Sequence, residues 1–466
     1  MICRAVAQNV EELADEVADE NFRDLRLNDR LHKIVSALAV QPELSLPRVF
    51  DEAGLEGAYR FLSNHRVTPE LLLSSHFAST RARCEAEQVV LVAHDTTTFS
   101  YRNDGERDGL GRAQPRNDRS AQTFHLHLSL AMAADGVRRP LGVVGFKTWV
   151  RSEKGTGTEY QRWQDQVDAS SLQLNGLTNA IHVADREADD YEMFCAFNRD
   201  GHRFVVRSQH DRLLAEAGKL RQALALVSTS AEREVAINRR KPKREAVKDK
   251  LHPPRERRVA RLSITGATVS LKRPLSPRAH ARMATPESLA INVIRVWEPE
   301  PPEGESALEW YLFTTEPIET PEQQLAVVDI YRARWVIEEY IKAIKTGCDF
   351  ERRQLQDYES LINLLAIFAP IACRLLLIRS EARRDAEGPA LSVVSQDELD
   401  VLRVLGRRKL KDAPTIRDIY LAIAALGGHI KYNGDPGWLT LARGFEKLQT
   451  LVEGWTAAKL QRASDQ

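Results

Sequence analysis

The chain has 466 residues, long enough for two or three domains with large hydrophobic cores. Its hydrophobic content of 43% and charged content of 28% are ordinary for a soluble globular protein, and 66 Lys and Arg balance 66 Asp and Glu. A net charge of zero excludes overall charge as an argument for nucleic-acid binding, so any such surface must be local.

The cysteines and the amino terminus bear on the cellular compartment. The five cysteines are scattered and form no C-x-x-C pair, which argues against a zinc ribbon or a disulfide framework and fits a reducing cytosol. Residues 1–20 contain no apolar segment of the signal-peptide kind, and the sequence has no window of 18 apolar residues that would indicate a membrane-spanning helix. We therefore expect a cytoplasmic protein.

The first 70 residues are predicted to be helical, with helices at 10–17, 29–39 and 56–62. Positive charge gathers on or next to the second helix, at Arg23, Arg26, Arg30 and Lys33. A spacing of four places Arg26 and Arg30 on one helix face, where they could contact a phosphate backbone. The same face could instead be solvated and paired with Asp24 and Asp29, and the sequence leaves both interpretations open.

Strand-like runs follow at 88–100, 123–131 and 139–148. Two short apolar, β-branched runs end in an aspartate, one before Asp95 and one before Asp185. Both are predicted to be buried strands of one sheet that deliver a carboxylate to its end or edge. Either aspartate by itself is more often a strand-end turn or a helix cap.

Two histidines, His125 and His127, alternate with apolar residues and therefore share one face of the predicted 123–131 strand. A pair at this spacing could bind a metal, but no further ligand cluster supports a zinc site, and we interpret them as ordinary strand histidines. The next predicted elements are a helix at 158–172, a helix at about 188–198, and a strand at 204–206 that ends in Arg207.

From 233 to about 294 the pattern is β-like with a strongly basic centre. Its cations are Arg239, Arg240, Lys241, Lys243, Arg244, Lys248, Lys250, Arg255, Arg257, Arg258 and Arg261. Prolines interrupt this centre, which predicts an exposed loop of high positive potential. In a chain of zero net charge, so local a concentration favours contact with a DNA backbone over a solvated loop without a partner.

The carboxyl-terminal part is predicted to be helical. A long apolar helix at 360–379 is expected to be interrupted near Pro370, and further helices are expected over 395–466. The last of them, at 439–460, carries an apolar stripe. Such a stripe packs either on its own domain or against another subunit.

One segment, 331–345, combines charge with helical periodicity and contains no Pro or Gly, so we predict a single helix. At about 100° per residue, a stripe roughly 60° wide carries Tyr331, Arg334, Glu338 and Lys345. A carboxylate flanked by two cations and a phenol suits a phosphodiester, although a surface helix with i,i+4 charge pairs has the same composition. Glu339, the rival carboxylate, lies about 100° further round.

Three carboxylates, those of Asp95, Asp185 and Glu338, could together supply oxygen ligands for two Mg²⁺ ions. Two ions about 4 Å apart would clamp the attacking and leaving oxygens of a phosphoryl transfer. The sequence does not decide between Mg²⁺ and Mn²⁺, which we regard as a plausible substitute.

The three acids lie in motifs that resemble those of the DDE transposases of the IS-four family. These motifs are HDTTTFSY around Asp95, ADREAD around Asp185 and the Y-x2-R-x3-E-x6-K signature around Glu338. Similar stretches extend the resemblance over nearly the whole chain, namely GAYRFL at 57–62, RFVVRS at 203–208 and LEWYLFTTEP at 308–317.

The resemblance implies an α/β fold with an RNase H-like catalytic core, an inserted β-subdomain, and helical N- and C-terminal domains. It places a helical DNA-binding domain at 1–70 and a dimerisation domain at 373–466. The catalytic domain would occupy 71–372, with its β-rich insertion at about 206–312.

The resemblance also implies roles for single residues. Asp95, Asp185 and Glu338 would be the catalytic metal ligands. The DNA-binding residues would be Tyr331, Arg334, Lys345, Trp310, Arg207, Arg30 and Arg60. Trp310 stands 21 residues before the signature tyrosine, and there the family forms a pocket for a base flipped out of the end duplex.

The implied activity is cut-and-paste DNA transposition in the nucleoid-associated cytoplasm of a bacterium. A homodimer, paired through the last helix, would bind the inverted-repeat ends, excise the element through hairpin ends and join its 3′-ends to target DNA. Two alternatives stay open: a structure-selective nuclease on the same fold, and a catalytically silent DNA-binding repressor. The nuclease would not need Trp310, the signature cations or a dimer helix, and the repressor would not need the three acids.

Overall fold

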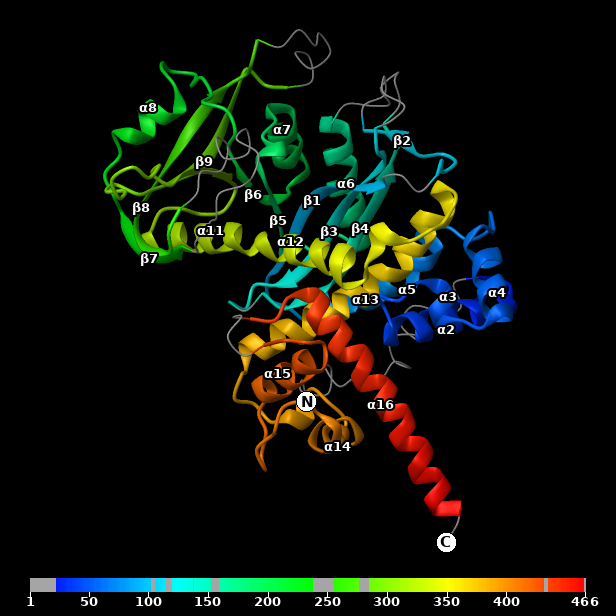
Figure 1. Cartoon of the computed structure of the whole chain (residues 1–466). Coiled ribbons are helices and arrows are strands. Elements are labelled where there is room, and N and C mark those ends of the chain that lie inside the picture. The colour runs from blue at the N-terminus through cyan, green and yellow to red at the C-terminus, as the bar shows by residue number, and fades with distance from the viewer. Residues whose placement is uncertain are drawn as a thin grey trace. The chain divides into compact units, whose positions relative to one another are not determined.

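The computed structural model describes residues 22–101, 105–113, 120–136, 138–151, 159–237, 255–275, 285–430 and 435–464 (Figure 1). Contacts along the chain divide it into two compact units. Unit 1 comprises Met1–Leu177 and Trp335–Gln466, and unit 2 comprises Thr178–Arg334. Both contain strands and helices, which confirms the prediction of a mixed α/β protein.

The strands of unit 1 form an antiparallel arrangement around a fully buried strand, β3. Its strands are β1 (Val90–Tyr101), β2 (Gly111–Arg112), β3 (Gln122–Ala133) and β4 (Pro140–Trp149). Strand β3 pairs with β1 along its whole length and with β4, while β2 pairs with its first residues. The three long strands agree with the predicted runs: β1 and β4 are rich in β-branched and aromatic residues, and apolar residues alternate with polar ones through most of β3.

Helices make up the rest of unit 1. They are α2 (Leu25–Val40), α3 (Leu46–Val49), α4 (Glu52–Leu62), α5 (Pro69–Glu85), α6 (Glu159–Gln173), α12 (Trp335–Lys342), α13 (Tyr358–Arg384), α14 (Gln396–Leu405), α15 (Ile416–Leu426) and α16 (Trp438–Ser464). Side chains of Asp24, Asp51 and Thr68 accept backbone N–H groups and so start α2, α4 and α5. The predicted helix at 10–17 lies outside the described residues.

Helix α13 is the core helix of unit 1, and it packs against α2, α4, α5, α15 and β4. The prediction of an interruption at Pro370 is wrong, because α13 continues through this residue. The sequence contains no uninterrupted run of 18 apolar residues, as expected, because Asn363 and Arg374 interrupt the most apolar part of α13. The stretch Tyr358–Leu377 is long and apolar enough to cross a membrane, but 89% of it is buried inside the protein, as in a core helix.

The last helices form one hydrophobic cluster. Residues Leu441, Phe445 and Leu448 of α16 are buried in it together with apolar residues of α14 and α15, while Trp455 is packed against it and partly buried. The apolar stripe of α16 therefore packs on its own part of the chain, which was one of the two open possibilities.

Unit 2 contains a sheet in the order β5-β6-β10-β9-β8-β7. Its strands are β5 (Ala180–Ala184), β6 (Arg203–Arg207), β7 (Ala231–Ile237), β8 (Arg258–Lys272), β9 (Ser288–Trp297) and β10 (Glu309–Thr314). Strands β5 and β6 are parallel and the remaining pairs are antiparallel. Its helices are η1 (Arg186–Ala188, 3-10), α7 (Tyr191–Asp200), α8 (Leu220–Ala225) and α11 (Pro321–Ala333).

The β-like segment after residue 233 is thus confirmed as strands β7, β8 and β9. Most of its basic centre, residues 238–254, lies outside the described residues. Of the predicted cations, Arg255, Arg257, Arg258 and Arg261 are described.

The prediction of a single helix over 331–345 is wrong. Helix α11 ends at Ala333 and α12 covers Trp335–Lys342, so Arg334 belongs to neither helix. A π-helix, η2 (Ala343–Gly347), follows and contains Lys345. Arg334 keeps right-handed helical dihedral angles, but the π-helix changes the angle per residue, so the stripe calculated for a regular helix does not extend to Lys345.

Candidate functional site

Asp95 lies in the middle of β1, with six more residues of the strand after it. The predicted strand at 88–100 is confirmed, but the expectation that it delivers Asp95 to an end or edge of the sheet is wrong, because the Thr-rich, aromatic residues that follow Asp95 continue the pairing with β3. Side chains alternate along a strand, so Asp95 shares one face of β1 with Phe99. Thr96 and Thr98 point to the opposite face, where their hydroxyls contact His127 and His125.

The face of β1 that carries Asp95 is the face against which the Glu338 segment packs. Helix α12 contacts β1, and the Lys345 ammonium of η2 lies 5.0 Å from the centre of the Phe99 ring. Lys345 also donates to the carbonyl oxygen of Thr98. Asp95 and Glu338 are both half-buried, as carboxylates that must reach a substrate need to be.

Glu338 and its neighbour Glu339 have different surroundings. The Glu339 carboxylate pairs with Arg379 of α13 at 3.7 Å, and both side chains are largely buried. Helix α12 buries Ile337 and Tyr340, and the Tyr340 hydroxyl donates to the carbonyl oxygen of Ala369. Glu339 therefore holds α12 on α13, which leaves Glu338 as the better candidate for chemistry.

Glu351 is a residue that sequence reasoning missed. Its carboxylate lies 3.5 Å from the Lys345 ammonium and accepts the backbone N–H of Ser100 at 3.1 Å. It thereby joins the η2 segment to the end of β1. The six-residue separation from Lys345 carries no recognisable signal, because the contact depends on the π-helical turn.

Asp185, in unit 2, directly follows β5, as predicted. One of its carboxylate oxygens accepts the N–H of Glu187 at 2.9 Å and so begins the 3-10 helix η1. Among the described residues the other oxygen has no hydrogen-bond partner, and the residue is half-buried. The helix-cap role that the sequence left open for Asp185 is thus present, but it occupies only one of the two carboxylate oxygens.

Three of the predicted DNA-binding residues come together in unit 2. The Arg207 guanidinium lies 5.9 Å from the centre of the Trp310 ring, and the Trp310 and Tyr331 ring centres are 6.2 Å apart. Trp310 is half-buried and Tyr331 is 8% exposed. We call Arg207, Trp310 and Tyr331 the aromatic–arginine cluster. Arg334 follows Tyr331 directly after the end of α11 and is half-buried.

Arg30 and Arg60 belong to the amino-terminal helices of unit 1. Arg30, on α2, lies across α4 so closely that a Cβ atom on Gly57 would stand 2.4 Å from its guanidinium carbon. Arg60 lies one turn after Gly57 and is exposed, with Glu56 as its ion-pair partner. The two cations are therefore near each other on one side of α4.

His125 and His127 are buried and have ordinary partners. Their Nδ1 atoms contact the hydroxyls of Thr98 at 3.0 Å and Thr96 at 3.3 Å, and the rings pack on Trp149 and Trp163. Burial lowers the pKa of His125 to about 4 and that of His127 to about 3, with further lowering by nearby cations. Both side chains are therefore neutral at physiological pH.

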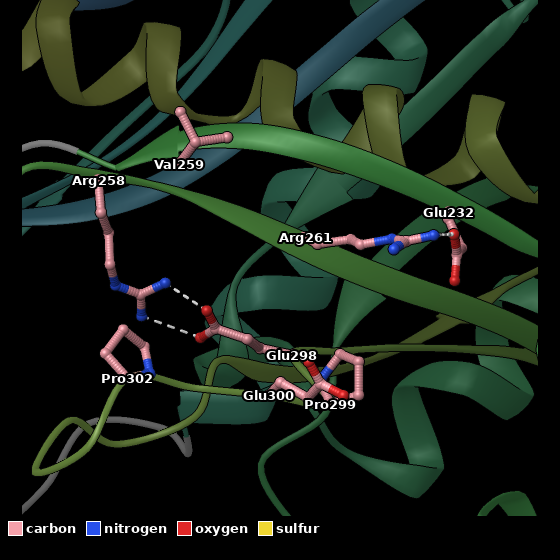
Figure 2. Close-up of a pocket in the computed structure, with 8 residues that line it drawn as sticks. All are labelled: Glu232, Arg258, Val259, Arg261, Glu298, Pro299, Glu300 and Pro302. Atoms are coloured by element: carbon pink, nitrogen blue, oxygen red, sulfur yellow. Dashed lines mark hydrogen bonds and ion pairs between the residues drawn. The ribbon is translucent and has the colours of Figure 1, made fainter.

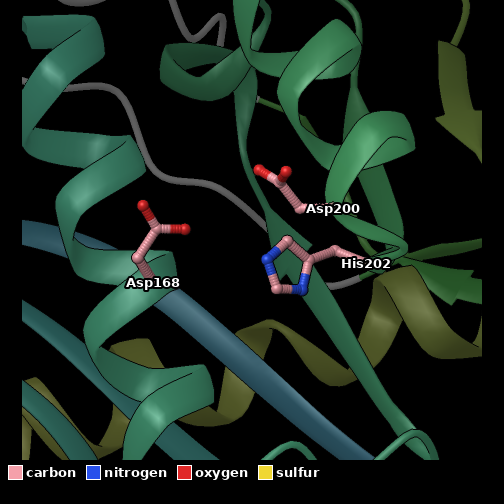
Figure 3. A group of neighbouring side chains, drawn as sticks. All are labelled: Asp168, Asp200 and His202. Atoms are coloured by element: carbon pink, nitrogen blue, oxygen red, sulfur yellow. The ribbon is translucent and has the colours of Figure 1, made fainter.

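Another group of metal-ligand type appears among the described residues. Figure 3 shows Asp200 and His202 at the turn between α7 and β6, on either side of Gly201. Asp200 pairs with Arg199 at 2.8 Å, and the His202 ring packs edge-on against Phe197. Asp168, also drawn, belongs to unit 1, and we assign no site to this group.

Unit 2 also contains a polar pocket of about 330 Å³ beside β8 (Figure 2). Arg258 donates to both carboxylate oxygens of Glu298 and to Glu305, and Arg261 pairs with Glu232. These ion pairs engage both arginines of the pocket and the carboxylates of Glu232 and Glu298. We therefore interpret these ion pairs as contacts that stabilise the fold of unit 2.

The predicted carboxylates fit a divalent metal ion by their chemistry. Asp95, Asp185 and Glu338 offer hard oxygen atoms, and each side chain is half-buried rather than sequestered in the core. In unit 1, Lys345 contacts Thr98 and Phe99 of β1, the strand that carries Asp95, and Glu338 lies on α12, which packs against β1. In unit 2, Arg207, Trp310 and Tyr331 lie together, and the same unit holds Asp185.

Comparison with known families gives two matches. Residues 11–67 match the family described as "Transposase DNA-binding", and residues 93–369, more than half of the chain, match the family described as "Transposase DDE domain". The fold is also similar to a solved structure, the "Cryo-EM structure of piggyBac transposase synaptic complex with hairpin DNA". That likeness is weak, with 9% sequence identity and a TM-score of 0.37, and it covers 98% of this chain and 83% of that chain.

Proposed function

The chain belongs to the DDE-domain transposase family and is a DNA transposase, a metal-dependent polynucleotidyl transferase, and we propose that it performs cut-and-paste transposition. The motifs around Asp95, Asp185 and Glu338 support a finer assignment to the IS-four family, with a likeness to the transposase of transposon Tn-five. The corresponding proposed fold is an RNase H-like core with a β-rich insertion between the second aspartate and the glutamate.

One observation carries the proposal most strongly. Helix α12, which carries Glu338, packs against β1, which carries Asp95, and Lys345 contacts the same strand at Thr98 and Phe99. The segments that carry two of the predicted acids and a predicted cation are therefore neighbours within unit 1. Acids with an adjacent cation suit phosphoryl transfer, in which negative charge develops on the oxygens of the transferred group.

Asp95, Asp185 and Glu338 would hold divalent metal ions, and we propose two Mg²⁺ with Mn²⁺ as a substitute. When bound, such ions lower the pKa of a water molecule and neutralise charge on the phosphate oxygens. Lys345, Tyr331 and Arg334 would hold phosphate oxygens of the transposon end by charge-assisted hydrogen bonds. Trp310, with Arg207 beside it, would stack a base that has left the duplex.

The proposed reaction is a series of phosphoryl transfers. A water oxygen attacks phosphorus at the transposon end, the P–O3′ bond breaks, and a 3′-hydroxyl is freed. That hydroxyl attacks the opposite strand to give a hairpin and to release the flanking DNA. A second water opens the hairpin, and the resulting 3′-hydroxyl attacks target DNA. Each step exchanges one phosphodiester P–O bond for another P–O bond.

The proposal extends to assembly, domains and location. The helical region at 1–70 would bind the inverted repeats, with Arg30 and Arg60 on phosphates, and residues 373–466 would pair two subunits that each hold one end. The cations of the basic segment at about 239–261 would contact DNA backbone, except Arg258, which is held in ion pairs with Glu298 and Glu305. The protein would act in the cytoplasm of a bacterium, on its nucleoid.

The test uses a plasmid in which the flanking repeats of this gene bracket a marker. Purified protein and Mg²⁺ are added, and products are separated on native and denaturing gels beside a Glu338→Ala control. We expect an excised fragment with hairpin ends that is absent with Glu338→Ala. Tight binding to the ends without cleavage in Mg²⁺ or Mn²⁺ would favour the silent repressor, and cleavage unrelated to the repeats would favour the nuclease.

A further inference from the structure

Unit 2 contains a buried carboxylate, Asp189, four residues after Asp185. Its side chain is fully inaccessible to solvent, and its ion-pair partner, Arg212, has a side chain that is 8% exposed. Neither residue has a role in the function proposed above. A buried carboxylate is strongly unfavourable unless hydrogen bonds and an opposite charge compensate for its lost hydration, so the surroundings of Asp189 need an explanation.

The compensation comes from one short segment, residues 208–212, which directly follows β6. One carboxylate oxygen of Asp189 accepts the backbone N–H groups of Gln209 at 2.6 Å and His210 at 2.9 Å. The other accepts from Arg212, whose Nε lies 2.9 Å away. Arg212 also donates to the backbone carbonyl of Asp189 at 2.8 Å, and its guanidinium lies 5.6 Å from the centre of the Phe194 ring.

The contacts of Asp189 connect Asp185 to the aromatic–arginine cluster. On one side, the backbone N–H of Asp189 donates to the backbone carbonyl oxygen of Arg186 at 3.2 Å and closes the 3-10 turn that begins at Asp185. On the other side, Asp189 fixes the segment that starts immediately after Arg207. That segment is also joined to β10, because the N–H of Ser208 donates to the carbonyl of Tyr311, next to Trp310, at 2.7 Å.

We propose that Asp189 is a positioning residue that sets which phosphodiester is cut. Its carboxylate fixes the separation between Asp185, which would hold metal, and the cluster, which would hold the end of the DNA. A change of about 1 Å in such a separation is enough to misalign a reacting group. The inference rests on the proposed function and deepens it, because it assigns the precision of cleavage to a bond network away from the reacting atoms.

A second buried ion pair of unit 2 provides a matched control. The side chains of Arg258 and Glu298 are 14% and 2% exposed, close to the values of Arg212 and Asp189. Arg258 joins the start of β8 to the residue that follows β9, at the pocket of Figure 2. This pair has no hydrogen bond to the Asp185 turn or to residues 207–212 among the described residues.

The experiment compares Asp189→Asn, Arg212→Lys and Glu298→Gln with the unchanged protein. Each is incubated with Mg²⁺ and end-labelled DNA that carries one flanking repeat, and the cut is mapped to the nucleotide on sequencing gels. Hydrogen–deuterium exchange of the DNA-free and metal-free proteins gives a second readout. Arg212→Lys keeps the charge but loses the forked guanidinium, and it remains informative if Asp189→Asn does not fold.

We expect Asp189→Asn to distribute cuts over neighbouring phosphodiesters, to lower the rate at the original position roughly 10- to 100-fold and to speed exchange at Gln209 and His210. Arg212→Lys should give a smaller redistribution. Glu298→Gln should lower the melting temperature and leave the cut position unchanged.

The outcomes separate this inference from the proposed function. If the unchanged protein makes no cut at the repeat, both are overturned. If it cuts at one position and Asp189→Asn and Arg212→Lys cut at the same position, however slowly, the inference alone is overturned, because a merely structural role lowers the rate without moving the cut.

Discussion

The two units support their candidate residues by different kinds of structure. In unit 1, Asp95 lies inside a long strand that pairs along its whole length, and a helix and a π-turn that carry Glu338 and Lys345 pack on its face. In unit 2, Asp185 begins a single 3-10 turn, and Arg207 ends a short strand before a loop. Regular pairing fixes the first region, whereas a few side-chain bonds fix the second.

This difference separates two kinds of substitution. Substitutions of the acids in unit 1 should abolish strand cleavage and leave DNA binding intact. Changes in unit 2 should affect how the DNA end is held as well as how fast it is cut. The following predictions test this contrast, beginning with the largest expected effect.

The first prediction concerns Glu338 and Glu339, which are adjacent in sequence but differ in surroundings. Glu338→Gln should lower strand cleavage roughly 1000-fold or more, since a lost metal ligand removes several kcal/mol of transition-state stabilisation. Binding to the repeat should stay within about 2-fold, which corresponds to about 0.4 kcal/mol. Cleavage is measured on labelled repeat DNA and binding by fluorescence anisotropy.

Glu339→Gln is the matched control. It leaves the partly buried Arg379 without its ion pair, so the free energy of unfolding should fall by about 1–3 kcal/mol. Cleavage per folded molecule should change little. If Glu339→Gln abolished cleavage while Glu338→Gln did not, the assignment of the catalytic glutamate would have to be reversed.

The second prediction concerns the aromatic–arginine cluster. Trp310→Ala should lower cleavage at the end roughly 5- to 150-fold, because stacking a base on an aromatic ring contributes about 1–3 kcal/mol. Trp310→Phe should restore part of the activity. Trp297 is a matched control in the neighbouring strand β9, with Arg295 4.3 Å from the centre of its ring.

Trp297→Ala should leave cleavage almost unchanged, because no predicted DNA contact includes Trp297. Equal losses for the two tryptophans would show that the sheet of unit 2 merely tolerates truncation poorly. The role of Trp310 in holding a base would then have no support.

The third prediction concerns the amino-terminal cations. Arg30→Ala should weaken binding to the repeat a few-fold and reduce the slope of log affinity against log salt by about 1, as expected for one lost phosphate contact. Gly57→Ala should have a similar effect, since its methyl group would displace the Arg30 guanidinium. Arg26, which is exposed and bonded to Asp24, is the control whose replacement by Ala should leave the slope unchanged.

Much of the framework was predictable from residue patterns. The strands β1, β5 and β6 follow from short apolar runs that contain β-branched residues, and β3 follows from the alternation of apolar and polar residues. The position of Asp95 within its strand was also available in principle, because Thr, Phe and Tyr residues follow it. The predicted run at 88–100 accordingly contains Asp95, although an acid after an apolar run by itself more often marks a strand end.

Other features could not be read from local patterns. Apolar residues continue through 331–345, so the period does not reveal the break at Arg334 or the π-turn at Lys345. Contacts such as Asp189 with residues 209–212 join positions about 20 residues apart, and nothing in either stretch identifies the other. Pro370 was predicted to interrupt α13 by a local rule, but the burial of the helix on several sides outweighs one missing hydrogen bond.

The smallest expected effect is a difference in acid sensitivity between the units. In unit 1, burial lowers the pKa of His127 to about 3 and that of His125 to about 4, whereas an unfolded histidine has a pKa of about 6.5. As the pH falls below about 6.5, the unfolded chain takes up the proton first, so the stability from the neutral histidines declines between about pH 6.5 and pH 3. For His127, the free energy of unfolding should fall by about 1.4 kcal/mol for each pH unit within this range.

In unit 2, the hydrogen bond from Arg258 lowers the pKa of Glu298, so the stability from this pair is present above about pH 4.3 and is lost as the pH falls through the lowered pKa. Between pH 6.5 and 5, protection of β3 against hydrogen exchange, corrected for intrinsic rates, should therefore fall more than that of β8. His127→Gln removes one titrating group and should flatten the pH dependence of β3 alone. An undiminished decline of β3 in that variant would refute the assignment, because the acid sensitivity of unit 1 would then come from groups other than His127.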